Sequence, residues 1–284
     1  MSLDETLADR GIGAPWTATR VLARAIDRLA FRLADLVVVD TAAHARRFAA
    51  TCGLHPSKVV VAPVGARDPA GLSTPGKTAG PSAPLSTSGL HVLYFGGFIP
   101  LHGVPVVLDA ARHLAGEEGV RFELVGDGQD AELAERQVGA WGLDRVQVRR
   151  TWMPEAELVQ RHVRVADVCL GIFADRPKTM DVVPAKLYLA LACGCPVVTA
   201  DTPAVREEIL AHAPPAEPPV LLCPPGDGRA LARALLRLRD DPELRAALAR
   251  RGRALYERRF TPACIAADLA RAIEAFHGRS SAPR

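Results

Sequence analysis

Several features that would place this chain in a large protein class are missing from its 284 residues. No apolar run approaches the about 18 residues that mark a membrane-spanning helix, and the N-terminus has no apolar stretch with a small-residue cleavage site. Six cysteines are present, but no CxxC pair and no histidines at metal-ligand spacing accompany them. These absences argue against an integral membrane protein, a secreted protein and a zinc protein. We expect a soluble, cytoplasmic chain whose cysteines serve as small core residues.

Strong charge is missing as well, because the net charge is only +3. A nucleic-acid-binding chain would carry a denser basic patch or a binding motif, so we expect no nucleic-acid partner. No strand is followed by GxGxxG with an acidic residue about 20 positions later, which argues against a nicotinamide dehydrogenase. Apolar material is plentiful: 49% of the residues are hydrophobic, enough for one large domain or two modest ones.

The stretch 166–199 is the most informative part of the sequence. Two short apolar runs, 166–172 and 196–199, are typical of strands buried in a parallel sheet, and 186–193 between them has helical composition. Strand, loop, helix and strand form a βαβ crossover, whose loop lies at the carboxyl edge of the sheet, where ligands bind. This loop, 173–183, carries charged side chains that favour an anionic ligand: Asp175, Arg176, Lys178 and Asp181.

Strands and helices alternate strictly after residue 90, with short turns between them. This order predicts a doubly wound parallel sheet with helices on both faces and right-handed crossovers. Strands are expected at 91–96, 121–126, 146–150, 166–172, 196–199 and 220–223, and helices at 104–114, 129–141, 155–163, 185–193, 202–212, 228–239, 242–259 and 262–277.

The first 66 residues contain too few strands for a sheet of this kind. A basic amphipathic helix is expected at 17–33, then a strand at 34–40, a helix at 42–51 and a strand at 58–64. Two arrangements of the first helix are open. It packs on a sheet with its arginines in water, which we favour, or it lies on an anionic membrane surface. A stretch rich in proline, glycine and serine then predicts a flexible linker.

The end of the central stretch, Ala192-Cys193-Gly194-Cys195-Pro196-Val197-Val198, resembles the donor-binding segment of retaining family 4 glycosyltransferases of the GT-B fold. In that pattern one glutamate precedes a second by eight residues, and here Asp181 and Leu189 take their places. The second glutamate accepts hydrogen bonds from the donor's ribose, which a leucine cannot do. Thr41 and Pro63-Val64-Gly65 fall where the family closes its N-terminal domain.

The resemblance implies an α/β protein of GT-B type, with one complete doubly wound parallel-sheet (Rossmann-like) domain and a partial Rossmann-like domain before it. In the family roughly another hundred residues precede this point, and they carry much of the acceptor pocket. The expected divisions are a partial N-terminal, acceptor-side domain at 1–66, a linker at 67–90, a nucleotide-sugar-binding domain at 91–260, and a C-terminal helix and tail at 261–284.

Candidate donor-binding residues follow from the carboxyl edge and from the resemblance. The turn after the strand at 91–96 is glycine-rich, so its backbone can approach a phosphate at the N-terminus of the next helix. In the family this turn carries Gly-Arg and a later Lys-Gly, which clamp the diphosphate, and Gly97 and His102 stand in those places. His102 is either a phosphate contact or a cap of its own helix. The candidates are Gly96, Gly97, His102, Gly103, Trp152, Met153, Arg176, Pro184 and Lys186.

Two residues of the loop 173–183 are the candidates for catalysis. Lys178 would neutralise the leaving diphosphate, and as a loop lysine it is expected to be mostly exposed. Asp181 either contacts a sugar hydroxyl or is a loop carboxylate in water. In the family the backbone of the segment 151–154 faces the nucleotide base. No acidic triplet marks a metal site, and GT-B enzymes do not in general need one, so neither a metal nor a cofactor is expected.

The predicted function is transfer of a sugar from a nucleotide diphosphate sugar to an unidentified glycan, lipid or small-molecule acceptor, with retention of configuration, by an enzyme of the hexosyltransferase type. The alternative is a catalytically silent relative that binds a nucleotide or completes a domain with a partner chain. Leu189, Gly97 and the short N-terminal part favour this alternative. The expected location is the cytoplasm, with peripheral contact to the inner membrane face as a further option.

Overall fold

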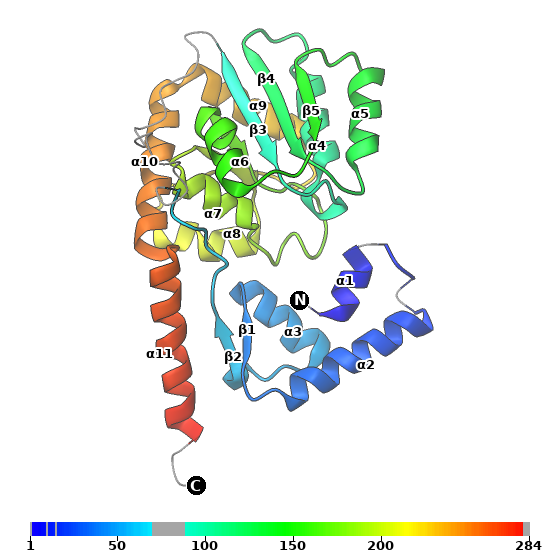
Figure 1. The fold of residues 1–284 in the computed structure, drawn as a ribbon, viewed down its shortest axis with the longest axis vertical. Coiled ribbons are helices and arrows are strands. Elements are labelled where there is room, and N and C mark those ends of the chain that lie inside the picture. The colour runs from blue at the N-terminus through cyan, green and yellow to red at the C-terminus, as the bar shows by residue number, and fades with distance from the viewer. Residues whose placement is uncertain (1, 10, 15, 70–88, 281–284) are drawn as a thin grey trace.

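The computed structural model describes residues 2–9, 11–14, 16–69 and 89–280. Its larger sheet lies in the C-terminal part, residues 89–280, and has six parallel strands in the order β5-β4-β3-β6-β7-β8 (Figure 1). The order reverses between β3 and β6, and in such sheets ligands bind at the carboxyl ends of the strands beside the reversal. The strands are β3 (Leu90–Phe95), β4 (Val120–Gly126), β5 (Val146–Arg150), β6 (Val168–Leu170), β7 (Val197–Ala200) and β8 (Leu221–Cys223).

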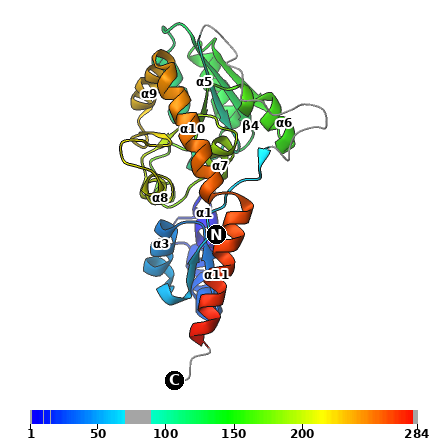
Figure 2. The same cartoon turned by 90° about the vertical axis from the view of Figure 1, so that its left-hand side faces the viewer.

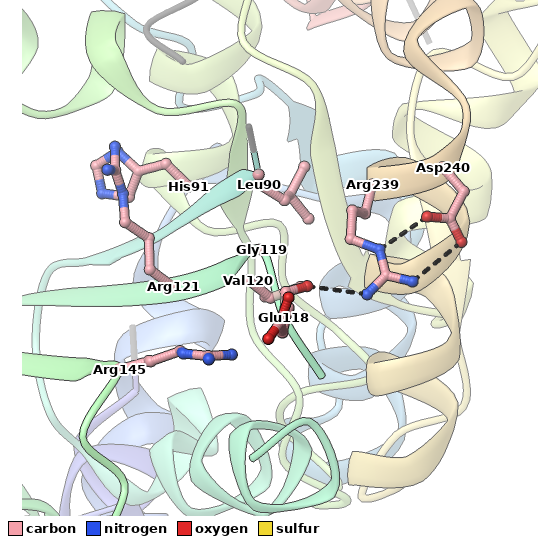
Figure 3. A pocket seen from close by; sticks show the side chains of 10 residues that line it. Leu90, His91, Glu118, Gly119, Val120, Arg121, Arg145, Arg239 and Asp240 are labelled. Carbon is pink, nitrogen blue, oxygen red and sulfur yellow. Dashed lines mark hydrogen bonds and ion pairs between the residues drawn. The ribbon is translucent and has the colours of Figure 1, made fainter. Parts of the chain in front are cut away.

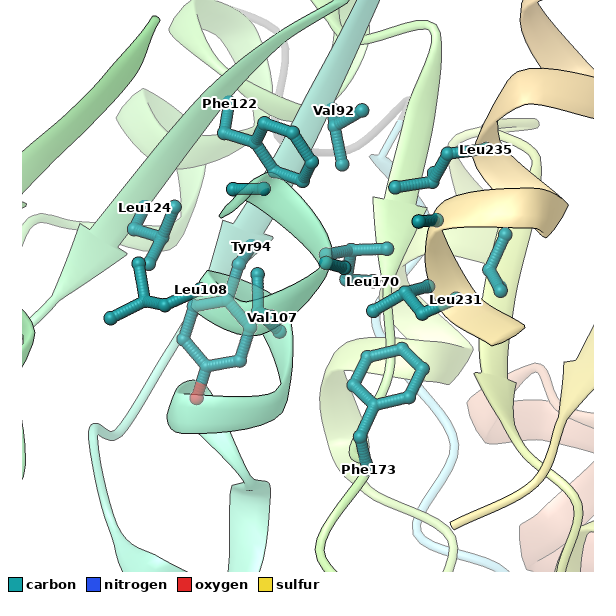
Figure 4. Packing of buried hydrophobic residues seen from close by; sticks show 14 of the residues in the cluster. Val92, Tyr94, Val107, Leu108, Phe122, Leu124, Leu170, Phe173, Leu231 and Leu235 are labelled. Atoms are coloured by element: carbon teal, nitrogen blue, oxygen red, sulfur yellow. The ribbon is translucent and has the colours of Figure 1, made fainter. Parts of the chain in front are cut away.

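Helices cover both faces of this sheet, as the alternating pattern predicts. One face is covered by α4 and α9, which pack together, and the other by α7 and α10. β3 is buried along its whole length because alternate side chains enter two separate cores. Val92 and Tyr94 point into the core shown in Figure 4, and Leu93 and Phe95 into the second. The helices are α4 (Val104–His113), α5 (Ala131–Ala140), α6 (Glu155–Arg161), α7 (Ala185–Ala192), α8 (Pro203–Glu208), α9 (Gly228–Asp240) and α10 (Pro242–Arg259).

A two-stranded parallel sheet lies in the N-terminal part, residues 2–69. β1 (Val37–Val39) pairs with β2 (Val59–Val61), and α3 (Ala42–Cys52) packs on them through Phe48. α11 (Pro262–Ser280) runs back from the C-terminal part beside β2 (Figures 1 and 2). Gly65 permits this approach, because its φ is +64° and a Cβ there would lie 2.3 Å from Ile265. α11 therefore joins the two parts.

The first helices differ from the prediction. α2 (Ala18–Leu33) packs on α1 and α3, with Arg20 and Asp27 buried. The favoured arrangement is wrong about the apolar residues, which point outward, whereas Arg28 and Arg32 are exposed as expected. The physical reason is α1 (Leu3–Asp9), a helix that the polar sequence did not predict: its Asp4 pairs with Arg20 and so takes up the polar face of α2. Five side chains of α2 that are between 47% and 73% exposed form the apolar stripe: Val21, Leu22, Ile26, Leu29 and Leu33.

The remaining differences concern where elements begin and end. The predicted strand 166–172 is shorter in the structure, where only β6 is paired: β3 and β7 each pair with two of its residues. The predicted helix 202–212 ends early, at Glu208, and a separate 3₁₀ turn, Leu210–His212, follows it. The predicted linker falls mostly on 70–88, which lie outside the described residues. Across the described ranges, no helix has both the length and the apolar character needed to span a membrane.

Candidate active site at the carboxyl edge of the sheet

Three turns meet backbone to backbone at the carboxyl edge of the larger sheet. Gly126, at the end of β4, has a φ of +145°, and a Cβ there would lie 2.0 Å from the carbonyl oxygen of Gly96. Gly103 precedes α4 with a φ of +71°, and a Cβ there would lie 2.5 Å from the backbone nitrogen of Ala174. Only glycine fits such positions without displacing its neighbours. The turns after β3, β4 and β6 therefore form one packed unit beside the strand-order reversal.

Tyr94, His102 and Lys186 lie together against the first of these turns. The Tyr94 hydroxyl donates to the carbonyl oxygen of Gly97 at 2.6 Å, and His102 Nδ1 lies 2.7 Å from the same oxygen. Because a carbonyl oxygen only accepts, His102 carries its proton on Nδ1. Lys186 Nζ lies 3.7 Å from the centre of the Tyr94 ring, which is the geometry of a cation–π contact. The turn is thus held by Tyr94 from β3 and by His102 from the turn itself, with Lys186 of α7 against the Tyr94 ring.

Lys186 is a buried cation at the start of α7, directly after Pro184 and Ala185. Only 7% of it is exposed. A lysine is electrostatically unfavourable at a helix N-terminus, and the Tyr94 ring supplies the compensating contact. The side chain of Lys186 lies against Gly96, where a Cβ would be 3.4 Å from Lys186 Cε, an ordinary contact distance. Burial lowers the pKa of Lys186 well below its usual value, so an anion beside it would favour the charged form.

His102 closes the turn and does not cap a helix. α4 begins at Val104, after the N-cap residue Gly103, without a side-chain cap, so the predicted structural alternative is wrong: the imidazole bonds back to Gly97 instead. Burial, and then the charge of Lys186, lowers the pKa of His102 to about 3. The ring is therefore neutral near pH 7. A phosphate contact through His102 stays a prediction.

The loop 173–183 is covered by the N-terminal part. Lys178 is only 7% exposed, which corrects the expectation of a mostly exposed loop lysine. Asp181 is held from two sides: the Thr41 hydroxyl donates to its carbonyl oxygen, and Arg47 NH1 lies 2.9 Å from its Oδ2. Burial raises the pKa of Asp181 even though Arg47 acts in the opposite direction. Asp181 is therefore an ion-paired carboxylate between the two parts. By contrast, Arg176 is exposed.

Glu5 of α1 also reaches this loop, and the sequence reasoning missed it. Its carboxylate lies 3.1 Å from His44 Nε2 and 3.1 Å from Arg47 Nε. Burial raises the pKa of Glu5, but the bond to His44 and the charges of His44, Lys178 and Arg47 outweigh it and lower that pKa. The one local signal is the acidic pair Asp4 and Glu5, which is typical of the first turn of a helix. Nothing in the sequence links it to residue 178.

Leu189 and the segment 151–154 complete the list of predicted positions. α7 is buried from Lys186 to its end, and Leu189 packs in the same core as Leu187, Tyr188 and Leu191. Leu189 is therefore a core side chain. Trp152 is 69% exposed, whereas Met153 is partly buried against that core. The segment lines a surface hollow of about 710 Å³ with β5 and α6.

A second hollow, of about 570 Å³, lies at the opposite edge of the sheet. It is lined by the amino ends of β3 and β4, with Leu90, His91, Arg121 and Arg145 around it (Figure 3). It is separate from the turns at the carboxyl edge. Within the part of the chain that the structure describes, no three His, Cys, Asp or Glu side chains are arranged to hold a metal ion.

Comparison with known proteins adds the family. The profile of the family described as "Glycosyl transferases group 1" matches residues 89–241, more than half of the chain. The chain belongs to the group 1 glycosyltransferases. The matched range includes the three turns and every predicted donor-binding residue, whereas Glu5, Thr41 and Arg47 lie ahead of it. No curated protein matches the sequence of this group 1 glycosyltransferase.

Comparison with solved structures shows that the chain has the GT-B fold. The chain is 20% identical to Anabaena HepE in complex with UDP and glucose, with a TM-score of 0.70, covering 89% of this chain and 67% of HepE. Sucrose-phosphate synthase from Thermosynechococcus elongatus is also 20% identical, with a TM-score of 0.70 and coverage of 91% and 62%. The lipopolysaccharide outer core galactosyltransferase WaaB, in its apo form, is 17% identical, with a TM-score of 0.62 and coverage of 89% and 64%. This group 1 glycosyltransferase chain thus spans about two thirds of the length of these structures.

Proposed function

We propose that the chain transfers a hexose from a nucleotide diphosphate sugar to an acceptor, with retention of configuration. Membership of the group 1 glycosyltransferases supports the reaction class, and the complex of HepE with UDP and glucose supports a nucleotide-sugar donor. The observation that carries the proposal is the buried Lys186 against the packed glycine turns. A buried cation beside the N-terminus of α4 suits a diphosphate.

In this proposal the turn 96–103 and the N-terminus of α4 hold the diphosphate, and Lys186 and Lys178 offset its charge. Negative charge accumulates on the diphosphate as its bond to the sugar breaks, and cations that are already in place stabilise it without reorganising. We propose that they do so without a bound metal. Asp181 is the candidate contact to a sugar hydroxyl, and the segment 151–154 is the candidate contact to the base. With Leu189 in the core, the ribose bonds to other groups or to water.

Calorimetry with UDP, GDP and ADP tests the donor site. We expect at least one of them to bind at millimolar concentration or below. Lys186→Met removes the charge while keeping the length of the side chain, and it should weaken binding about tenfold or more, the scale of a hydrogen bond to a charged group. Arg136→Met is the control, because Arg136 forms an exposed pair with Glu132 on α5. An absence of heat with all three nucleotides would refute the proposal.

Lys178→Ala tests the second lysine in the same assay. The loss of its charge should weaken nucleoside diphosphate binding by about 1.5 to 3 kcal/mol. Because Lys178 is buried near Glu5, the melting temperature must be measured alongside affinity. An unchanged affinity in a folded variant would remove Lys178 from the donor site.

A second candidate function is that of a silent family member, which binds a nucleotide or completes a domain with a partner chain. The exposed apolar stripe on α2 favours it, and so does β1, which in the described residues pairs only with β2. An assay for released or transferred sugar, using UDP-, GDP- and ADP-sugars, separates the two candidates. Nucleotide binding without release or transfer of sugar from any of these donors would favour the silent protein.

A further inference from the structure

α1 places a buried carboxylate between the two parts of the molecule. The side chain of Glu5 is 8% exposed, and its two oxygens lie 3.1 Å from Arg47 Nε and 3.1 Å from His44 Nε2. A second nitrogen of the same guanidinium, Arg47 NH1, lies 2.9 Å from Oδ2 of Asp181 in the loop 173–183. One guanidinium therefore links α1 to the loop that carries the candidate catalytic residues.

Lys178 belongs to the same group of charges. It is buried in that loop, three positions before Asp181, and its charge is one of those that lower the pKa of Glu5. Glu5 is thus surrounded by three basic side chains from two segments, α3 and the loop. A carboxylate in this position reduces the positive potential that Lys178 offers to any other anion.

We propose that Glu5 is an internal counter-ion for the candidate diphosphate site, so that docking of α1 and binding of a nucleoside diphosphate compete. This inference rests on the proposed function, in which Lys178 offsets the charge of the diphosphate. When a diphosphate approaches Lys178, its charge and that of Glu5 repel each other. The lower-energy arrangement releases Glu5, and α1 with it, from the loop.

The attachment of α1 is of a kind that can be released. The helix has seven residues, too few to be stable by itself in water. Besides Glu5, three residues of α2 hold it. Asp27 accepts hydrogen bonds from the backbone nitrogens of Leu3 and Asp4 at 2.7 and 2.9 Å, and Arg20 and Arg24 pair with Asp4. Elements held by a few polar contacts open locally without global unfolding.

Glu5→Gln provides the first test, with UDP binding followed by calorimetry. The variant keeps the shape of the side chain but removes its charge, so we expect UDP to bind about fivefold tighter or more, the lower end of typical coupling between sites. The same change should lower the melting temperature, because three basic groups lose their counter-ion. A merely structural role would instead weaken binding. Glu132→Gln is the matched control, since Glu132 lies in an exposed pair on α5.

Asp27→Ala provides a second, independent test, because Asp27 fastens α1 from α2 without contributing to the charges around Lys178. Loosening α1 in this way should also tighten UDP binding. In the wild type, hydrogen exchange of the amides of residues 3–9 should become faster when UDP is added. Slower exchange, or unchanged or weaker UDP binding in both variants, would overturn the counter-ion proposal alone. Failure of the wild type and both variants to bind UDP, GDP or ADP would overturn the proposed function with it.

Discussion

At the scale of single residues, the candidate site is organised by burial. Burial disfavours the charged form of Lys186, because its surroundings exclude water, and the Tyr94 ring at 3.7 Å compensates only in part. His102, beside it, is neutral, and its Nδ1–H donates a hydrogen bond to the Gly97 carbonyl oxygen. The site is therefore poised to gain from an anion that a water-exposed lysine would bind weakly.

Proton uptake on binding tests this reading of Lys186. Because burial lowers its pKa, a diphosphate beside it should raise that pKa again and draw a proton from solution. The heat of UDP binding at a pH of about 8 should then vary with the ionisation enthalpy of the buffer. Lys186→Met should abolish this dependence, and Arg136→Met should keep it. Heats from the wild type that are the same in every buffer would contradict the prediction.

Leu189 is the second residue whose role depends on burial. If Leu189 faced the donor's ribose, Leu189→Glu would supply the missing acceptor, but the side chain packs inside a core with Tyr188 and Leu191. An unpaired carboxylate there should cost several kcal/mol of stability, and we expect no gain in nucleotide affinity. Thermal melting with and without UDP checks both statements, with Leu189→Met as the volume-conserving control. Tighter UDP binding by Leu189→Glu would show that the position faces the ligand.

At the scale of elements, α2 shows how a neighbouring helix can bury the polar face of a helix and leave its apolar face exposed. Its apolar stripe is at the spacing that would normally point inward, but α1 occupies the polar side through Asp4 and Asp27. The stripe is left in contact with solvent. Exposed apolar rows of this kind are common at interaction surfaces.

Removing the stripe should not destabilise the chain. The double variant Ile26→Asp/Leu29→Asp replaces side chains that are 47% and 58% exposed, so its melting temperature should stay close to that of the wild type. Binding of an apolar dye and self-association, followed by light scattering, should fall. Leu231→Asp is the contrasting control, because Leu231 is buried in the core between β3 and α9 and should unfold the chain. A large drop in melting temperature for the double variant would show that the stripe is packed.

β4 carries a second buried charge, Glu123, which joins neighbouring elements. Its oxygens lie 3.2 Å from His91 Nε2, 3.2 Å from His162 Nδ1 and 2.7 Å from Arg149 Nε. Burial by itself would raise the pKa of Glu123, but these basic neighbours hold it at about 2. A carboxylate whose pKa is lowered in the folded state stabilises the fold at pH values above its unfolded pKa, here 4.5. That contribution is lost as the pH falls toward 2.

Glu123→Gln should therefore be less stable than the wild type near neutral pH, and the difference should shrink as the pH falls below 4.5 toward 2. Melting temperatures between pH 7 and 3 measure this. Glu132→Gln, in an exposed pair, should follow the wild type throughout. A constant gap between Glu123→Gln and the wild type would mean that Glu123 contributes through packing and not through its charge.

At the scale of the whole molecule, two connections join the parts. α3 contacts α8 and the loop 173–183, with Arg46 paired to Glu207 at 2.5 Å. On the other side α11 lies along β2, and the Tyr256 hydroxyl donates to the Ala66 carbonyl at 3.1 Å. His44 lies at the first connection, bonded to Asp40 at 2.7 Å as well as to Glu5.

The titration of His44 should be visible in the stability of the whole chain. Burial lowers its pKa, but the bonds to Asp40 and Glu5 outweigh this and raise the pKa from 6.5 to about 9. A histidine whose pKa is raised in the folded state contributes stability that is fully present below pH 6.5 and is lost as the pH rises through about 9. His44→Asn should be less stable than the wild type at pH 6, and the two should converge near pH 9 or above. His55→Asn, at an exposed position, is the control. A difference that persists at high pH would contradict the assignment.

The larger sheet could be predicted from the sequence alone, and so could the edge that carries the candidate site. Short apolar runs such as 91–96 and 196–199 predict strands buried on both faces, and the alternation with helices leaves only a parallel, doubly wound arrangement. The order of the strands then places the turn 96–103 and the loop 173–183 at one edge. These inferences succeed because each depends on residues that are neighbours in the chain.

Only the tertiary structure decided which charges meet and which side chains are buried. Glu5, Arg47 and Lys178 come from three distant segments, and no local pattern joins them. The same holds for Lys186 and Tyr94. Lys178 was expected in water because loop residues usually are, but its exposure depends on α1 and α3, which cover the loop from outside its own sequence. Periodicity reports which face of an element is apolar, whereas packing decides what that face meets.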